Sequence, residues 1–292
     1  MTGLGWDPRD LASGVGAPAL WGTTYLVTSE LLPAGRPLMA ATVRALPIGV
    51  LFIAMLGRWP ASGQRLRTLV VSACNISVFF PLLFVAAYRL PGGLAATIVA
   101  TQPLVVGVLS AMLLAEPLRA RQVVASLSGL AGVAMLVGGA SATPDPVGVV
   151  AAAGAALSMA LGLVLTQRWR GILSLRCMPA WQLFFGGILL IPPLLVLDAD
   201  PLALDVPGAF GLLHLAVLGG GVAYWLWFRA LRTLSPNVLS VLMLLSPVTA
   251  TVLGAVLAAQ FLTVAQLFGV TLVLASVGWM TWTQAPTTRT RV

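Results

Sequence analysis

The sequence predicts an all-α polytopic membrane protein, a fold class indicated by its hydropathy, its scarcity of charge and its long apolar segments. Of its 292 residues, 59% are hydrophobic and only 8% are charged, whereas soluble globular proteins carry about 25% charged residues. Eight acidic and sixteen basic residues are too few to cover a water-facing surface. Because backbone inside lipid must satisfy its own hydrogen bonds, and because β-barrel alternation is absent from the sequence, the apolar segments are expected to be helices.

Ten apolar segments follow one another with short connections, each close to the roughly 20 residues that a membrane-spanning helix needs. Charges, prolines and glycines delimit them at residues 12–32, 37–57, 68–88, 93–115, 122–140, 147–167, 179–197, 208–228, 237–259 and 265–283. The first segment is longer than the apolar core of a signal peptide, so we expect it to stay in the mature chain.

The arginines predict the orientation, since positively charged residues in short loops stay on the cytoplasmic side. With the N-terminus inside, thirteen arginines fall in cytoplasmic loops or tails, and only Arg36 and Arg89 fall in the opposite loops. Both termini are therefore expected in the cytoplasm, which requires an even number of crossings. The expected location is a bacterial inner membrane.

A repeat relates the two halves of the chain. Sliding the sequence by 144 residues aligns residues 81–133 with 225–277 without a gap, and Pro103 then meets Pro247. We therefore predict two five-helix units, residues 1–143 and 144–292. Because five is odd, the second unit enters the membrane from the opposite side. Many secondary transporters are built from such inverted repeats, with the substrate site between the halves near mid-membrane.

The stretch YRLPGGLAATIVATQPLVVGVLSAMLLAEPLRAR, residues 88–121, resembles the EamA repeat of the drug/metabolite transporter superfamily. The matching features are Pro103 in the fourth helix, Glu116 at its end, and Gln122 and Gly129 beyond it. The second copy departs from the pattern with Gln260 where an acidic residue is usual. The resemblance implies a ten-helix exporter that works by alternating access. Members of this superfamily export amino acids, nucleosides, cationic drugs or sugar phosphates, and the branch of the aromatic amino-acid exporter YddG is the one that the chain resembles.

Polar and aromatic side chains inside the segments mark the predicted cavity, because an amide facing lipid is costly and symmetric prolines free backbone groups. The predicted substrate-binding residues are Trp21, Thr24, Asn75, Phe79, Phe80, Thr97, Gln102, Pro103, Ser158, Gln182, Phe185, Tyr224, Trp225, Ser246 and Pro247. Pro103 and Pro247 are expected to line the cavity and act as gates, the alternative being ordinary kinks.

Three titratable residues are candidates for coupling or for structural roles. Arg44 lies inside the second segment, with Glu30 as a possible partner. A clamp between the first two helices and a contact with a substrate carboxylate both remain open. His214 is either hydrogen-bonded to a neighbouring helix or a titrating group of a proton-coupled cycle. The coupling ion does not follow from the sequence.

The predicted function is export of small amphipathic metabolites, chiefly aromatic and other neutral amino acids, by a monomer. No converging set of His, Cys, Asp or Glu supports catalysis, a metal or a cofactor, and the scattered charges do not form a nucleic-acid surface. Two alternatives remain open, namely a broad exporter of hydrophobic drugs and a membrane scaffold that transports nothing.

Overall fold

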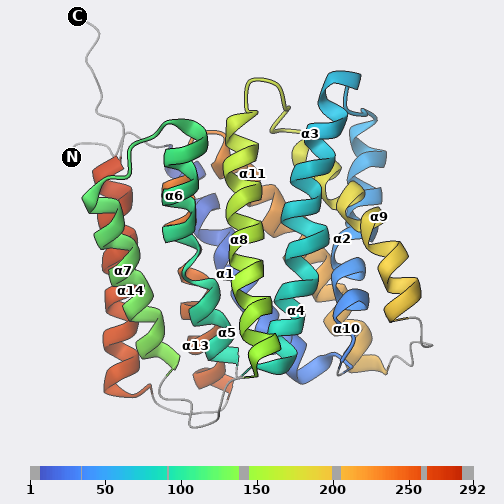
Figure 1. The fold of residues 1–292 in the computed structure, drawn as a ribbon. Helices are drawn as coiled ribbons and strands as arrows, with labels where there is room; N and C mark the ends of the chain where they lie inside the picture. The colour runs from blue at the N-terminus through green and yellow to red at the C-terminus, as the bar shows by residue number, and fades with distance from the viewer. Residues whose placement is uncertain are drawn as a thin grey trace, which may run out of the picture.

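The structure is a computed structural model that describes residues 7–33, 35–90, 92–137, 145–198, 205–257 and 262–284. All regular secondary structure in these ranges is helical, which confirms the predicted fold class. Figure 1 shows the helices side by side in a single bundle, with their axes roughly parallel.

The first half of the bundle contains five rods in chain order, where a rod is one helix or a run of consecutive helices. Two of them, the third and the fourth, consist of more than one helix. The helices are α1 (Pro8–Leu31), α2 (Pro37–Leu56), α3 (Ser62–Ser72), the π-helix η1 (Ala73–Val78), α4 (Phe79–Arg89), α5 (Gly92–Val99), α6 (Gln102–Leu114) and α7 (Ala120–Val137).

The second half has the same order of rods, and its third and fourth rods are again composite. The helices are α8 (Pro146–Arg168), α9 (Met178–Leu197), α10 (Val206–His214), the π-helix η2 (Leu215–Val222), α11 (Ala223–Leu231), α12 (Pro236–Leu242), α13 (Leu245–Leu257) and α14 (Val264–Gln284). The rods follow the ten predicted segments, with the largest difference at the third rod, which starts at Ser62 instead of residue 68.

Eight helices in the described ranges are long and apolar enough to cross a membrane, two fewer than the ten predicted crossings. Of the other two rods, α7 offers a shorter apolar stretch, Ala120–Leu136. The other, α1, has 24 residues, but small and polar side chains interrupt its apolar surface. The chain is thus a polytopic membrane protein, while ten crossings stay a prediction.

The composite rods change geometry at matched positions. The third rods contain η1 and η2, and the fourth rods break at Ala100–Thr101 and at Met243–Leu244. Positions 100 and 244 are separated by the 144 residues that align the halves of the sequence. Each break lies just before a proline of the next helix, and proline lacks the N–H that would continue helical hydrogen bonding across it. The division at residue 143 remains a prediction.

Two helix pairs form opposite edges of the bundle. At one edge α7 packs along α14, and at the other α2 packs along α9 (Figure 1). Small residues permit the second contact, since a Cβ added at Gly49 would lie 2.4 Å from the backbone nitrogen of Phe184. The remaining rods, with α1 and α8 among them, enclose the centre of the bundle.

Candidate functional site

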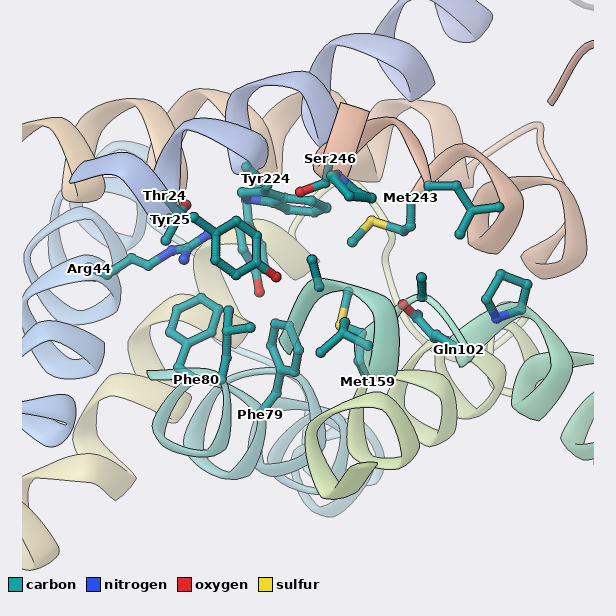
Figure 2. A pocket seen from close by; sticks show the side chains of 18 residues that line it. Thr24, Tyr25, Arg44, Phe79, Phe80, Gln102, Met159, Tyr224, Met243 and Ser246 are labelled. Carbon is teal, nitrogen blue, oxygen red and sulfur yellow. The ribbon is translucent and has the colours of Figure 1, made fainter. Parts of the chain in front are cut away.

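A cavity lies at the centre of the bundle, where side chains from both halves of the chain meet (Figure 2). Its volume is about 40 Å³. It is lined by Trp21, Thr24, Tyr25, Arg44, Phe79, Phe80, Leu83, Ala96, Val99, Ala100, Gln102, Pro103, Met159, Tyr224, Met243, Leu244, Ser246 and Pro247. A cavity needs about 10–15 Å³ to hold one water molecule, and a cavity of about 150 Å³ holds benzene. In this conformation the cavity therefore has room for water and not for an amino acid.

The two helix breaks border this cavity. Gln102 and Pro103 begin α6 on one side, and Ser246 and Pro247 lie in the first turn of α13 on the other. The side-chain nitrogen of Gln102 is buried without a hydrogen-bond partner. Breaking each rod at this depth brings its polar residues to the cavity wall.

An aromatic wall closes the cavity toward α11. The Trp21 ring meets Tyr224 edge to face at 5.5 Å between centroids and lies 5.2 Å from Trp227. Phe80 meets Tyr224 edge to face at 6.1 Å. Such arrangements are the favoured geometries of aromatic pairs. The rings hold one another in place and present a rigid apolar surface.

Trp21 is fixed further by the π-helix η2. Its indole Nε1 donates a hydrogen bond of 2.8 Å to the carbonyl oxygen of Gly219, and only 7% of the residue is exposed. The glycines of η2 also let α2 approach, because a Cβ added at Gly220 would lie 2.3 Å from the carbonyl oxygen of Arg44. η2 thereby positions both Trp21 and Arg44.

Arg44 is buried, with 2% of the residue exposed, and its guanidinium lies 4.5 Å from the centroid of the Phe80 ring. Its Nε and Nη1 atoms lack hydrogen-bond partners. Among the residues that the structure describes, no carboxylate forms a salt bridge with it. The predicted pairing with Glu30 is wrong, because Glu30 lies at the exposed end of α1 and accepts a hydrogen bond from Ser29.

Six predicted site residues lie away from the cavity wall: Asn75, Thr97, Ser158, Gln182, Phe185 and Trp225. Asn75 and Gln182 are both buried, and the Asn75 amide donates to the Gln182 amide at 3.0 Å. Ser158 donates to the carbonyl oxygen of Cys74 in η1 at 2.7 Å. These polar groups tie η1 to α8 and α9, so they point inward, as predicted, without reaching the cavity.

The two aromatic residues of that set lie toward the outside. Trp225 is 53% exposed, and the Arg229 guanidinium lies 6.0 Å from its ring centroid. Phe185 is half-buried and packs against Trp59, 6.0 Å away. Contrary to the prediction, neither Trp225 nor Phe185 lines the cavity.

His214 contacts a neighbouring helix outside the cavity wall. Its Nε2 lies 2.8 Å from the Thr23 hydroxyl on α1. This is the contact expected if His214 is hydrogen-bonded to a neighbouring helix. A metal site finds no support in the described ranges, which contain no group of three or more His, Cys, Asp or Glu that could hold one.

Several cavity residues were not predicted, chiefly apolar ones: Tyr25, Leu83, Ala96, Val99, Ala100, Met159, Met243 and Leu244. Met159 could have been found, since it aligns with Trp21 when Gly16 is laid on Gly154. Tyr25 directly follows the predicted Thr24. The others carry no polar or repeat signal.

Ion pairs join the two halves near the helix ends. Arg36 pairs with Asp198, which also accepts from the backbone N–H of Met39 at 2.9 Å. Arg229 of α11 lies 3.0 Å from Asp10 of α1. Arg89 donates to Asp145 at 2.9 Å. The hydrogen bond from the Arg89 guanidinium, with that from the backbone N–H of Val147, lowers the pKa of the partly exposed Asp145 below its ordinary value.

Comparison with known proteins decides the family. The EamA-like transporter family matches residues 11–138 and again residues 146–282. The chain belongs to the EamA-like transporter family. It is 42% identical over 263 residues to Protein PecM of Dickeya dadantii, covering 89% of this chain and 88% of PecM.

Other relatives of this EamA-like transporter are more distant. It is 27% identical over 265 residues to the uncharacterized transporter YvbV of Bacillus subtilis, covering 88% of this chain and 87% of YvbV. A solved crystal structure superimposes with a TM-score of 0.76 at 22% identity, covering 93% of this chain and 96% of that one. The similarity to this solved structure supports the fold alone. Assignment to the YddG branch stays a prediction.

Proposed function

We propose that this EamA-like transporter exports small amphipathic metabolites, with aromatic and other neutral amino acids as its substrates. The observation that carries the proposal is the central cavity, which has an aromatic wall and is bordered by the breaks of two matched helices. Ligand sites typically combine a mostly apolar lining with a few polar groups that fix orientation.

The lining favours neutral or zwitterionic substrates. Its residues include no carboxylate for a cationic drug, and a single arginine is too little for a phosphate dianion. Trp21, Phe79, Phe80 and Tyr224 supply surface for a sizeable apolar side chain. These lining residues favour amino acids over cationic drugs and sugar phosphates as substrates.

The small volume of the cavity supports a mechanism in which the helices around the site move. Since about 40 Å³ does not hold an amino acid, the half-helices must move apart for a substrate to enter. The breaks at Ala100–Thr101 and Met243–Leu244 are candidate hinges, because a few residues with interrupted helical hydrogen bonding can absorb such a motion. Alternating access would open the cavity to one side and then to the other.

The proposal includes a monomer in the bacterial inner membrane, with both termini in the cytoplasm. A single chain supplies every residue of the cavity wall. The arginine distribution supports the orientation.

The test is counterflow of labelled Phe, Leu and Thr into liposomes that contain the purified protein and unlabelled amino acid. Ala96→Leu should block uptake, since Ala96 lines the cavity and three added carbons occupy much of its volume. Ala131→Leu is the matched control on the exposed face of α7 and should transport normally.

The other outcomes separate the alternatives. Uptake of a hydrophobic cation without any amino-acid counterflow would favour a drug exporter. No flux of either kind from well-folded protein would favour a scaffold and contradict the proposal.

A further inference from the structure

One buried positive charge in the cavity lacks a counter-ion. Arg44 is the sole charged residue among those that line the cavity, and among the residues that the structure describes it forms no salt bridge. A guanidinium inside a membrane protein is costly unless it is paired, hydrated or bound to a ligand. The face of the Phe80 ring satisfies it only in part, at 4.5 Å.

The donors of Arg44 are also unused. Nε and Nη1 are buried and have no hydrogen-bond partner, and the same is true of the Thr24 hydroxyl. Figure 2 shows Thr24 and Tyr25 on the same side of the cavity as Arg44. Buried polar groups in native proteins are nearly always hydrogen-bonded. Unpartnered donors gathered at one end of a cavity therefore offer a binding site to an acceptor that enters it.

No neighbouring group in the described part of the chain accepts a hydrogen bond from Nε or Nη1 of Arg44. A Cβ added at Gly219 would lie 3.5 Å from Arg44 Nε, and the carbonyl oxygen of this glycine accepts from the Trp21 indole at 2.8 Å. The Tyr224 hydroxyl donates to the carbonyl oxygen of Asn75 at 3.3 Å. The surroundings hold Arg44 in position, while its Nε and Nη1 donors stay available.

We infer that Arg44, with Thr24, is the seat of a substrate carboxylate, so that this transporter selects small monoanionic or zwitterionic carboxylates with an apolar side chain. Guanidinium and carboxylate match in geometry and can form two parallel hydrogen bonds. The aromatic wall of Trp21, Phe79 and Phe80 then receives the side chain, and Gln102 lies at the far end of the cavity (Figure 2). This inference rests on the proposed function, because it names the chemical group by which the same cavity recognises its substrate.

The first experiment needs no variant. Thermal stabilisation of the purified protein should be measured with Phe and 3-phenylpropionate, which keep the carboxylate, and with phenylalaninamide and phenethylamine, which lack it. Loss of a charge-assisted hydrogen-bonded pair should weaken binding by about 10- to 100-fold. Equal stabilisation by all four compounds would overturn the inference.

The second experiment assigns the effect to the residue. Arg44→Gln should remove the preference for carboxylate over carboxamide, and Arg44→Lys should retain part of it, because lysine keeps the charge without the planar fork. Arg58→Gln, at an exposed position just beyond α2, is the matched control and should keep the full preference. If folded Arg44→Gln still discriminates, the carboxylate lies elsewhere.

The two proposals can fail separately. Stabilisation by the carboxylates without any counterflow would contradict the proposed transport and leave the carboxylate seat standing. Counterflow of Phe that phenethylamine inhibits as well as unlabelled Phe does would support transport and contradict the seat.

Discussion

Replacing Gly22 with alanine should force α1 away from α13 next to the cavity. A Cβ at this position would lie 2.5 Å from the carbonyl oxygen of Ser246 and 2.6 Å from the Cβ of Thr249. Ordinary contact begins near 3.4 Å, so the two helices must separate by about 0.9 Å, the difference between 3.4 and 2.5 Å. A backbone oxygen cannot rotate out of the way as the end of a side chain can.

The cost follows from that clash. Overpacking a buried contact destabilises by about 1–3 kcal/mol, and the higher helix propensity of alanine offsets about 1 kcal/mol. Gly16→Ala gains the same propensity in the same helix, and its added Cβ would meet only Leu226 Cδ1 at 3.4 Å. The two variants should therefore differ by about 1–3 kcal/mol.

The assay is thermal unfolding of both variants in detergent, followed by the fraction of monodisperse protein. Gly22→Ala should melt several degrees below Gly16→Ala, and its transport per folded molecule should also fall, because Ser246 lines the cavity. Equal melting temperatures would show that α1 and α13 are not packed this closely and would refute the reasoning.

Three further predictions concern selectivity, acid stability and orientation. Trp21→Ala should weaken binding of Phe about 10- to 100-fold and that of Thr much less, since about 1–3 kcal/mol of ring contact is lost. The control is Trp225→Ala, because Trp225 is 53% exposed. Equal losses for Phe and Thr would show that Trp21 is only a packing residue. Because the pKa of Asp145 is lowered, its contact with Arg89 is complete above the ordinary Asp pKa and is lost as the pH falls through the lowered pKa. The melting temperature of Asp145→Asn, which can still cap α8, should therefore fall less on acidification than that of the wild type. An identical acid profile would argue against the ion pair. A reporter that is active only in the periplasm should give no signal at the C-terminus, and strong activity there would overturn the topology and the inverted arrangement of the halves with it.

The helical rods could be predicted from the sequence because long apolar segments in lipid have few alternatives to a helix. Pro103 and Pro247 were found because matched prolines leave a signal at a fixed offset, and both lie at the cavity. Asn75 and Gln182 were misplaced for a physical reason. A polar side chain that avoids lipid can find its partner on the next helix, and these two amides bond to each other.

The apolar part of the cavity wall could not be predicted. Met243 and Leu83 face the cavity, yet nothing distinguishes them from neighbours that face another helix. The π-helices add a second difficulty, since each shifts the rotation of the residues beyond it relative to a 3.6-residue period. Tyr224 and Trp225 are the second and third residues after η2, and they differ in exposure, with Tyr224 2% exposed and Trp225 53% exposed.

The central claim is that substrate passes through the cavity between the two broken helices. The most direct measurement is labelling of single cysteines at positions 102 and 246, in a Cys74→Ala, Cys177→Ala background, by a small aqueous thiol reagent with and without Phe. Ser276→Cys on α14, buried and outside the cavity wall, is the control. Both cavity cysteines should react and be protected by Phe, while the control stays unreactive. If both remain unreactive in every condition, or react equally with Phe present, the transport path lies elsewhere.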